Sequence, residues 1–115
     1  NITVPAENIA EMVEWVKASA GEKGMKAMAY AHVGTGGMHI HVASDAGRDE
    51  FKAALTELSA AVYEKCASLG GDVRGEYGIG YAKVPFFGEK VRGEFAAVKA
   101  KLDPKGILNP GKVAD

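Results

Sequence analysis

Residues 30–41 decide the fold, and they read Tyr30-Ala31-His32-Val33-Gly34-Thr35-Gly36-Gly37-Met38-His39-Ile40-His41. The three glycines in this stretch open the positive-φ conformations that tight turns use. An unbroken helix or strand would hold His32 and His39 at least about 10 Å apart, so a turn is needed to bring their imidazoles together. If Val33 and Met38 close that turn, His32 lies directly opposite His39 on one face of a hairpin, with Cβ atoms about 5 Å apart. Two imidazoles at that separation can share a metal ion or a substrate.

Alternating side chains on either side of the glycines predict the two strands of this hairpin. Within residues 25–33, small and apolar side chains alternate with Lys26, Met28, Tyr30 and His32. Within residues 38–42, the apolar side chains alternate with His39 and His41. All the histidines of the chain therefore fall on one face of the predicted sheet.

Apolar residues that recur at spacings of three and four predict amphipathic helices. The first helix follows Pro5 and ends near Gly21, because proline suits a first helical turn. The second runs over residues 49–69 and stops at the following glycine pair. The last ends at Asp103, since the proline that follows disfavours helical geometry there.

The order of the predicted elements indicates the fold class. A short strand at residues 2–4 precedes the first helix, and a glycine-rich loop at residues 71–80 holds Glu76 at its centre. The order strand, helix, strand, strand, helix, helix predicts an α+β fold, with helices on one face of a small antiparallel sheet and a C-terminal tail. The histidines occupy the other face.

The composition is that of a soluble globular domain. The chain has 115 residues, 47% hydrophobic and 25% charged, which is the size of one domain with one core. A net charge of −1 gives no electrostatic reason to expect nucleic acid or an anionic membrane as a partner. No apolar run approaches the roughly 20 residues of a membrane-spanning helix, so we expect no transmembrane segment.

Two further features concern the context of the chain. Cys66 is the only cysteine, which excludes an internal disulfide and is compatible with a reducing compartment, so we expect a cytoplasmic location. The chain begins at Asn1 without a methionine, and its predicted sheet has only about three strands, few for an isolated domain. We therefore expect a longer protein whose preceding segment adds strands.

Three stretches carry more specific patterns. Residues 32–39 read His-Val-Gly-Thr-Gly-Gly-Met-His, residues 75–80 read Gly-Glu-Tyr-Gly-Ile-Gly, and residues 102–113 read Leu-Asp-Pro-Lys-Gly-Ile-Leu-Asn-Pro-Gly-Lys-Val. They resemble, in this order, the His-x-Gly-Asp-Gly-Asn-x-His signature, the Gly-Glu-His-Gly run and the C-terminal ending of one family. That family is the FAD-linked oxidases and dehydrogenases of the vanillyl-alcohol oxidase fold, in the branch of glycolate oxidase and D-lactate dehydrogenases.

The resemblance implies the C-terminal part of an FAD-dependent dehydrogenase or oxidase that acts on a small 2-hydroxy acid such as glycolate or D-lactate. Residues 1–102 would form part of a ferredoxin-like cap, and residues 103–115 a tail that returns to an N-terminal FAD-binding domain absent from this chain. That domain would hold most of the FAD, with Asn109 nearest the flavin edge. The resemblance also allows an electron-acceptor subunit as a partner, and it implies that the isolated fragment is inactive.

The resemblance also assigns metal ligands. Family members that use a metal bind it through both signature histidines and the glutamate of the Gly-Glu-His-Gly run, which correspond to His32, His39 and Glu76. Two imidazoles and a carboxylate suit zinc, manganese or iron, with positions left for substrate. Such a metal would hold the substrate carboxylate and hydroxyl, lower the hydroxyl pKa and orient the C2 hydride toward the flavin. The alternative is that the histidines are satisfied or exposed side chains without a ligand.

The chain departs from the family pattern at three positions. Thr35 and Gly37 replace the acid and the amide of the first signature, and Tyr77 replaces the histidine that resembles the catalytic base. A phenol is a poor base at neutral pH, because its reference pKa is about 10, unless a metal or a cation lowers that value. Three alternatives stay open: Tyr77 is tuned in this way, His41 replaces it as the base, or the mechanism differs.

Two basic residues near the glutamate loop are candidates for substrate binding. Arg74 and Lys83 could pair with the substrate carboxylate, and the alternative is that both are solvated charges. The departures from the family pattern also favour a second function, a non-catalytic metal- or ligand-binding α+β module that has lost the redox role. A third function is a pure assembly domain.

Overall fold

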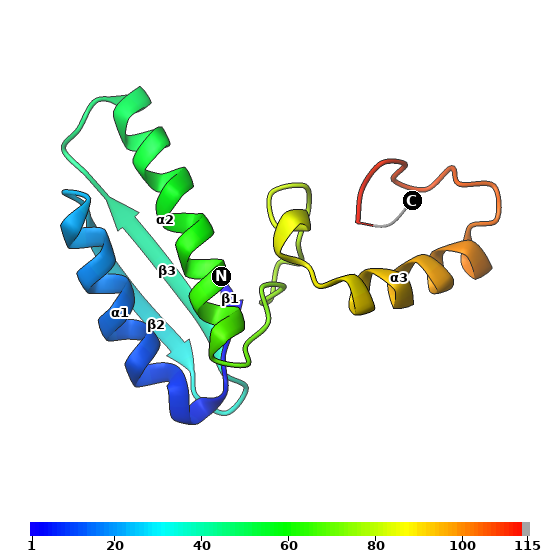
Figure 1. The fold of residues 1–115 in the computed structure, drawn as a ribbon, viewed down its shortest axis with the longest axis horizontal. Coiled ribbons are helices and arrows are strands. Elements are labelled where there is room, and N and C mark those ends of the chain that lie inside the picture. The colour runs from blue at the N-terminus through cyan, green and yellow to red at the C-terminus, as the bar shows by residue number, and fades with distance from the viewer. Residues whose placement is uncertain (114–115) are drawn as a thin grey trace. The chain divides into compact units, whose positions relative to one another are not determined.

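The computed structural model describes residues 1–113 and separates into two compact units, one of residues 1–77 and one that begins at Gly78. In chain order, the first unit contains β1 (Ile2–Thr3), the short 3-10 helix η1 (Ala6–Asn8), α1 (Ile9–Glu22), β2 (Lys26–His32), β3 (Gly37–Ala43) and α2 (Arg48–Ser68) (Figure 1). The second unit contains η2 (Val84–Phe86) and α3 (Glu89–Leu102). These elements confirm the predicted α+β fold. The predicted division into a cap at residues 1–102 and a tail at 103–115 stays a prediction.

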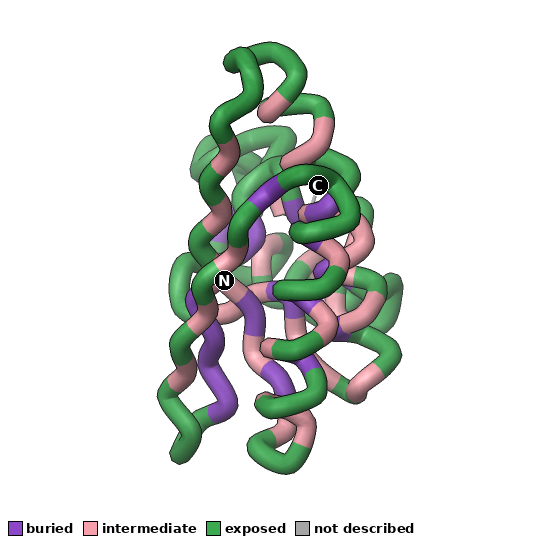
Figure 2. Tube along the Cα trace, turned by 90° about the vertical axis from the view of Figure 1, so that its left-hand side faces the viewer, coloured by how far each residue is buried: buried purple, intermediate pink, exposed green. Residues whose placement is uncertain are grey.

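The sheet of the first unit has three antiparallel strands in the order β1-β3-β2. Intermediate and exposed residues alternate along β2, as the sequence pattern predicted. Figure 2 colours the Cα trace by burial and shows buried, intermediate and exposed residues interleaved along the chain. The helix face of β2 carries only alanines within the strand, and such small side chains let the helices approach closely. The opposite face carries the histidines together with Tyr30, which is 49% exposed.

The register of the hairpin differs from the prediction. His32 pairs with Gly37, and His39 pairs with Tyr30, so the two histidines are diagonal neighbours and not direct partners. The turn contains residues 33–36, because the N–H groups of Thr35 and Gly36 both donate to the His32 carbonyl, at 3.0 and 2.9 Å. The shift relative to the prediction is two residues, and because side chains alternate with period two, both histidines keep the predicted face.

α1 and α2 run along the sheet and bury its apolar face (Figure 1). The core contains buried residues from both helices, from β1 and from β3, and Cys66 is fully buried within it. Its members are Ile2, Val4, Met12, Val16, Ala20, Met25, Met38, Leu58, Val62 and Cys66. Among the described residues, no helix is both long and apolar enough to span a membrane.

The second unit is organised around the end of α3. Phe87 is buried and packs edge-on against Phe95, with ring centroids 5.3 Å apart. α3 ends at Leu102, one residue before the predicted end at Asp103, and the Asp103 carboxylate then accepts N–H bonds from Ile107 at 3.1 Å and Leu108 at 2.9 Å. Asp103 therefore joins the end of the helix to the segment that follows it.

Candidate functional site

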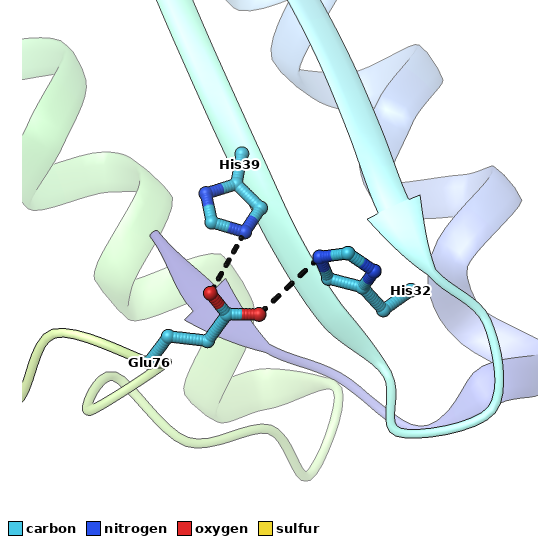
Figure 3. A group of neighbouring side chains, drawn as sticks. All are labelled: His32, His39 and Glu76. Atoms are coloured by element: carbon cyan, nitrogen blue, oxygen red, sulfur yellow. Dashed lines mark ion pairs between the residues drawn. The ribbon is translucent and has the colours of Figure 1, made fainter.

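Three side chains converge on the solvent side of the sheet. His32 ends β2, His39 lies in β3, and Glu76 lies in the loop after α2, as Figure 3 shows. The Nε2 atom of His32 is 3.3 Å from Oε1 of Glu76, and the Nε2 atom of His39 is 3.3 Å from Oε2 of the same carboxylate. One donor atom from each residue lies within 4.8 Å of the others. The structure therefore brings together the three residues predicted as metal ligands, all within the first unit.

The glycine turn brings the two histidine rings together and also accommodates β1. The rings of His32 and His39 meet edge to face, with centroids 5.5 Å apart. Gly36 has φ +74°, and its carbonyl accepts the Val4 N–H at 3.0 Å. A Cβ atom on Gly36 would lie 1.9 Å from the Val4 carbonyl oxygen. Only glycine fits this position, because any side chain would push the N-terminal segment away from the turn.

The N-terminal strand also holds the loop that carries Glu76. Thr3 pairs with Gly37 of β3, and its backbone exchanges two hydrogen bonds with Asp72, at 2.8 and 2.7 Å. A Cβ atom on Gly71 would lie 2.5 Å from the Thr3 carbonyl oxygen, so this approach also needs glycine. β1 therefore lies between the histidine strand and the loop. Its hydrogen bonds to Asp72 position the start of the loop segment that carries Glu76.

Burial makes the site asymmetric. The side chain of His39 is 8% exposed, whereas those of His32 and Glu76 are 57% and 46% exposed. A buried His39 has a fixed position, and the other two side chains have room to adjust. The two exposed side chains lie on the face of the sheet opposite the helices.

The donor set fits a divalent cation. Ligand atoms about 2.0 to 2.1 Å from a tetrahedral zinc ion lie about 3.3 Å from one another. Each histidine Nε2 lies 3.3 Å from one of the two Glu76 oxygens, and one donor atom from each of the three residues lies within 4.8 Å of the others. His32 and Glu76 are the exposed members of the group, so a bound ion would need their side chains to move toward it.

The two candidate bases, Tyr77 and His41, contact different aromatic rings. The ring of Tyr77 is 5.7 Å from the His39 ring, and Tyr77 is 76% exposed. His41 is exposed on the predicted face, but it is not part of the group of three ligands. Its ring stacks on Tyr30 instead, with centroids 5.5 Å apart and an interplanar angle of 15°.

The remaining predicted residues lie outside this group. Arg74 binds the Asp72 carboxylate: its backbone N–H and its Nε both donate at 2.8 Å, and Nη2 forms an ion pair with the same carboxylate. Lys83 is buried at the start of η2, and Asn109 lies in a turn with φ +46°, where its carbonyl accepts the Lys112 N–H at 3.3 Å. Lys83 and Asn109 both belong to the second unit.

One residue near the site was given no role from the sequence. Tyr30 stacks on His39 with ring centroids 4.8 Å apart and an interplanar angle of 11°. Strand alternation already placed Tyr30 on the histidine face, but the predicted register put His32 opposite His39. The observed register puts Tyr30 there.

The comparisons with known proteins identify the family of the chain. Residues 1–113 match the family model described as FAD linked oxidases, C-terminal domain. The chain belongs to this family. This FAD-linked oxidase domain is 33% identical over 115 residues to the glycolate oxidase subunit GlcD of Bacillus subtilis and 33% identical over 118 residues to a D-lactate dehydrogenase of Anaerostipes hadrus. It is 32% identical over 117 residues to the mitochondrial D-2-hydroxyglutarate dehydrogenase of Bos taurus.

These alignments cover nearly all of this chain but little of each relative. They include 96%, 98% and 98% of the chain and 24%, 25% and 21% of the respective relatives. The chain thus spans about a quarter of the length of the curated relatives it matches. The family predicted from the three sequence motifs is confirmed.

Proposed function

We propose that this domain belongs to an FAD-dependent oxidoreductase that acts on a small 2-hydroxy acid, and that His32, His39 and Glu76 bind a divalent zinc, manganese or iron ion there. The observation that carries the metal proposal is the convergence of donor atoms from two strands and a distant loop within 4.8 Å. The substrate class is supported by the names of the relatives, since glycolate, D-lactate and D-2-hydroxyglutarate are all 2-hydroxy acids.

The three ligand residues differ in what they contribute. His39 anchors the ion because its ring is buried and stacked, while His32 and Glu76 complete the set from the solvent side. Three protein ligands leave coordination positions for the carboxylate and hydroxyl of the substrate. The metal, when bound, polarises the substrate hydroxyl as a Lewis acid, and the FAD, when bound, accepts the hydride.

The hydroxyl proton of the substrate needs an acceptor. We propose the Tyr77 oxygen in its phenolate form for this role, which requires a nearby metal or cation, because the Tyr77 ring contacts His39; His41 is the second candidate. Arg74 and Lys83 are the proposed partners of the substrate carboxylate. The ion pair with Asp72 restricts the rotamer of Arg74, so the guanidinium would already be oriented when the substrate carboxylate binds.

The rest of the proposed enzyme lies outside this chain. The length of the relatives supports an N-terminal FAD-binding domain as the principal partner, with residues 103–115 returning to it and Asn109 nearest the flavin. An electron-acceptor subunit is a further proposed partner. A cytoplasmic location is supported by the cysteine content of the sequence, since a single cysteine, Cys66, allows no internal disulfide.

The test uses the full-length protein with FAD bound. Anaerobic mixing with glycolate, D-lactate or D-2-hydroxyglutarate should bleach the flavin absorbance with at least one acid. Removal of the metal with a chelator should abolish this reduction, and added zinc, manganese or iron should restore it. Undiminished turnover in metal-free protein would exclude the metal proposal, and no bleaching by any 2-hydroxy acid would exclude the activity.

A second function is a non-catalytic metal- or ligand-binding module. It is favoured by Thr35, Gly37 and Tyr77, which replace polar groups of the family signature. It predicts metal binding by the full-length protein without flavin reduction by any acid. The same mixing experiment, combined with a metal titration, therefore distinguishes the two functions.

A further inference from the structure

Tyr30 makes contacts that none of the proposed roles uses. Its ring stacks nearly parallel on the ring of His39 and also on the ring of His41. The residue is half-exposed, lies on the sheet face opposite the helices, and is the direct strand partner of His39. The apolar core therefore does not require an aromatic ring at this position.

We propose that Tyr30 is a positioning residue for the metal site: its ring fixes the plane of the His39 imidazole so that Nε2 points at Glu76. The proposal rests on the metal site of the proposed function. Rotation about the Cβ–Cγ bond of histidine has broad minima, so burial alone leaves the direction of Nε2 poorly determined. A stacked phenol restricts that rotation to the two orientations, 180° apart, that keep the 11° angle, and the contact with Glu76 selects the one in which Nε2 faces the carboxylate.

The two other rings against His39 do not replace this function. His32 meets His39 at 86°, edge to face, and is itself a ligand that must be able to adjust. Tyr77 meets His39 at 62° and is 76% exposed, so it does not lie parallel to the imidazole. The Tyr30 ring is the only nearly parallel ring against His39 in the described part of the chain. Such stacking is worth a factor of about 2 to 12 in an equilibrium constant.

Stacking on His41 adds a second consequence. His39 and His41 lie two residues apart on one strand face, about 7 Å along the strand, which is a spacing that allows two histidines to bind one ion. The ring of Tyr30 contacts both, and His41 stays out of the ligand group. The stack thus favours a site with three protein ligands and open positions for substrate.

The experiment measures Co²⁺ affinity and the Co²⁺ absorption spectrum in the full-length protein. Tyr30→Val and Tyr30→Thr remove the ring but keep a β-branched residue that suits a strand, and Tyr30→Phe keeps the ring. We expect the Kd for Co²⁺ to rise about 2- to 12-fold in the first two variants, with an altered spectrum, and to stay unchanged in Tyr30→Phe. Met28→Ala is the matched control, since Met28 lies on the same strand and face, and it should leave both readouts unchanged.

A Kd and a spectrum in Tyr30→Val equal to the wild type would overturn the proposal, as would an equal loss in Tyr30→Phe, which would implicate the hydroxyl. A second readout does not need the metal. In protein with labelled histidine, the NMR signals of the His39 ring protons should carry a ring-current shift that Tyr30→Phe keeps and Tyr30→Val loses.

Failure of the metal site and failure of this inference are distinguishable. If the wild type binds no Co²⁺ or Zn²⁺ but the ring-current shift depends on the Tyr30 ring, the metal site is wrong and Tyr30 still orients His39. If the wild type binds metal and neither readout responds to loss of the ring, the metal site stands and the role of Tyr30 is wrong.

Discussion

The two units of the chain differ in how they bury their apolar side chains. In the first unit, Met12, Val16, Ala20, Met38 and Cys66 have no exposed surface at all. In the second, α3 has no buried residue, and Val98, Leu102, Ile107 and Leu108 are between 57% and 74% exposed. The candidate site therefore lies on a unit that supports itself, whereas the second unit presents apolar surface that an added domain could cover.

Hydrogen bonds replace apolar packing at the end of α3. Lys99 pairs with the Asp103 carboxylate and also donates to the Leu108 carbonyl. The hydrogen bond from Lys99, followed by those from the backbone N–H groups of Leu108 and Ile107, holds the pKa of Asp103 below its usual range. The first unit thus depends on its core and the second on a small group of polar contacts.

The largest expected effect concerns the cores of the two units. Leu58→Ala should lower the free energy of unfolding of the isolated chain by about 2 to 5 kcal/mol, because Leu58 is fully buried. Val98→Ala, at a position 57% exposed, should change it by less than about 0.5 kcal/mol. Urea denaturation measures both. Equal effects would show that α3 is packed as tightly as the sheet, and a larger Val98 effect in the full-length protein would show that a further domain covers α3.

The next effect concerns the buried ligand. His39→Gln should weaken Zn²⁺ binding on the order of 100-fold or more, because the best-fixed of the three ligands is lost. His41→Gln, on the same strand face but outside the ligand group, should weaken it less than about 3-fold. Isothermal titration of the full-length protein measures both affinities. Similar losses in the two variants would mean that His41 is a ligand.

A smaller effect comes from the glycine turn. Gly36→Ala should destabilise the first unit by about 1 to 3 kcal/mol, since the new Cβ meets the Val4 carbonyl and the backbone has positive φ. Gly34→Ala is the matched control, because nothing lies within 4 Å of a Cβ there and its φ is not positive. Thermal unfolding compares the two, and equal melting temperatures would mean that β1 does not need this turn.

The smallest effect is confined to the second unit. Because the pKa of Asp103 is depressed in the folded state, its contribution is present above its usual pKa and is lost as the pH falls through the depressed value. Acidification below about pH 4, or Asp103→Asn at neutral pH, should raise the exchange of the Ile107 and Leu108 amides and leave β3 protected. Hydrogen exchange measures this difference, and an equal loss of protection in β3 would contradict the separation into two units.

The hairpin shows what the sequence could predict of the site. The alternation of side chains placed His32 and His39 on the correct face of the sheet, because every second residue of a strand points to the same face. The register was wrong by two residues, because the four-residue turn lies one position earlier than predicted, at residues 33–36, where the Gly36 carbonyl accepts a hydrogen bond from Val4, a residue far away in the sequence. A local pattern cannot contain that information.

Glu76 and Arg74 show the same limit on what a local sequence pattern can predict. Glu76 was assigned from the family resemblance and not from spacing, because its position depends on the pairing of Asp72 with Thr3. Arg74 pairs with Asp72, which is only two residues away in the sequence. This ion pair was not predicted, because proximity in a loop does not fix the direction of a side chain. The substrate roles of Arg74 and Lys83 stay predictions.

The most direct test of the metal site is the metal content of the full-length protein. Elemental analysis of protein dialysed against Zn²⁺ should find about one ion per chain, and Glu76→Gln, which keeps the shape of the side chain but removes its charge, should lose most of it. A wild-type protein without bound metal, or a Glu76→Gln variant that binds as much as the wild type, would contradict the proposal that these three side chains form a metal site.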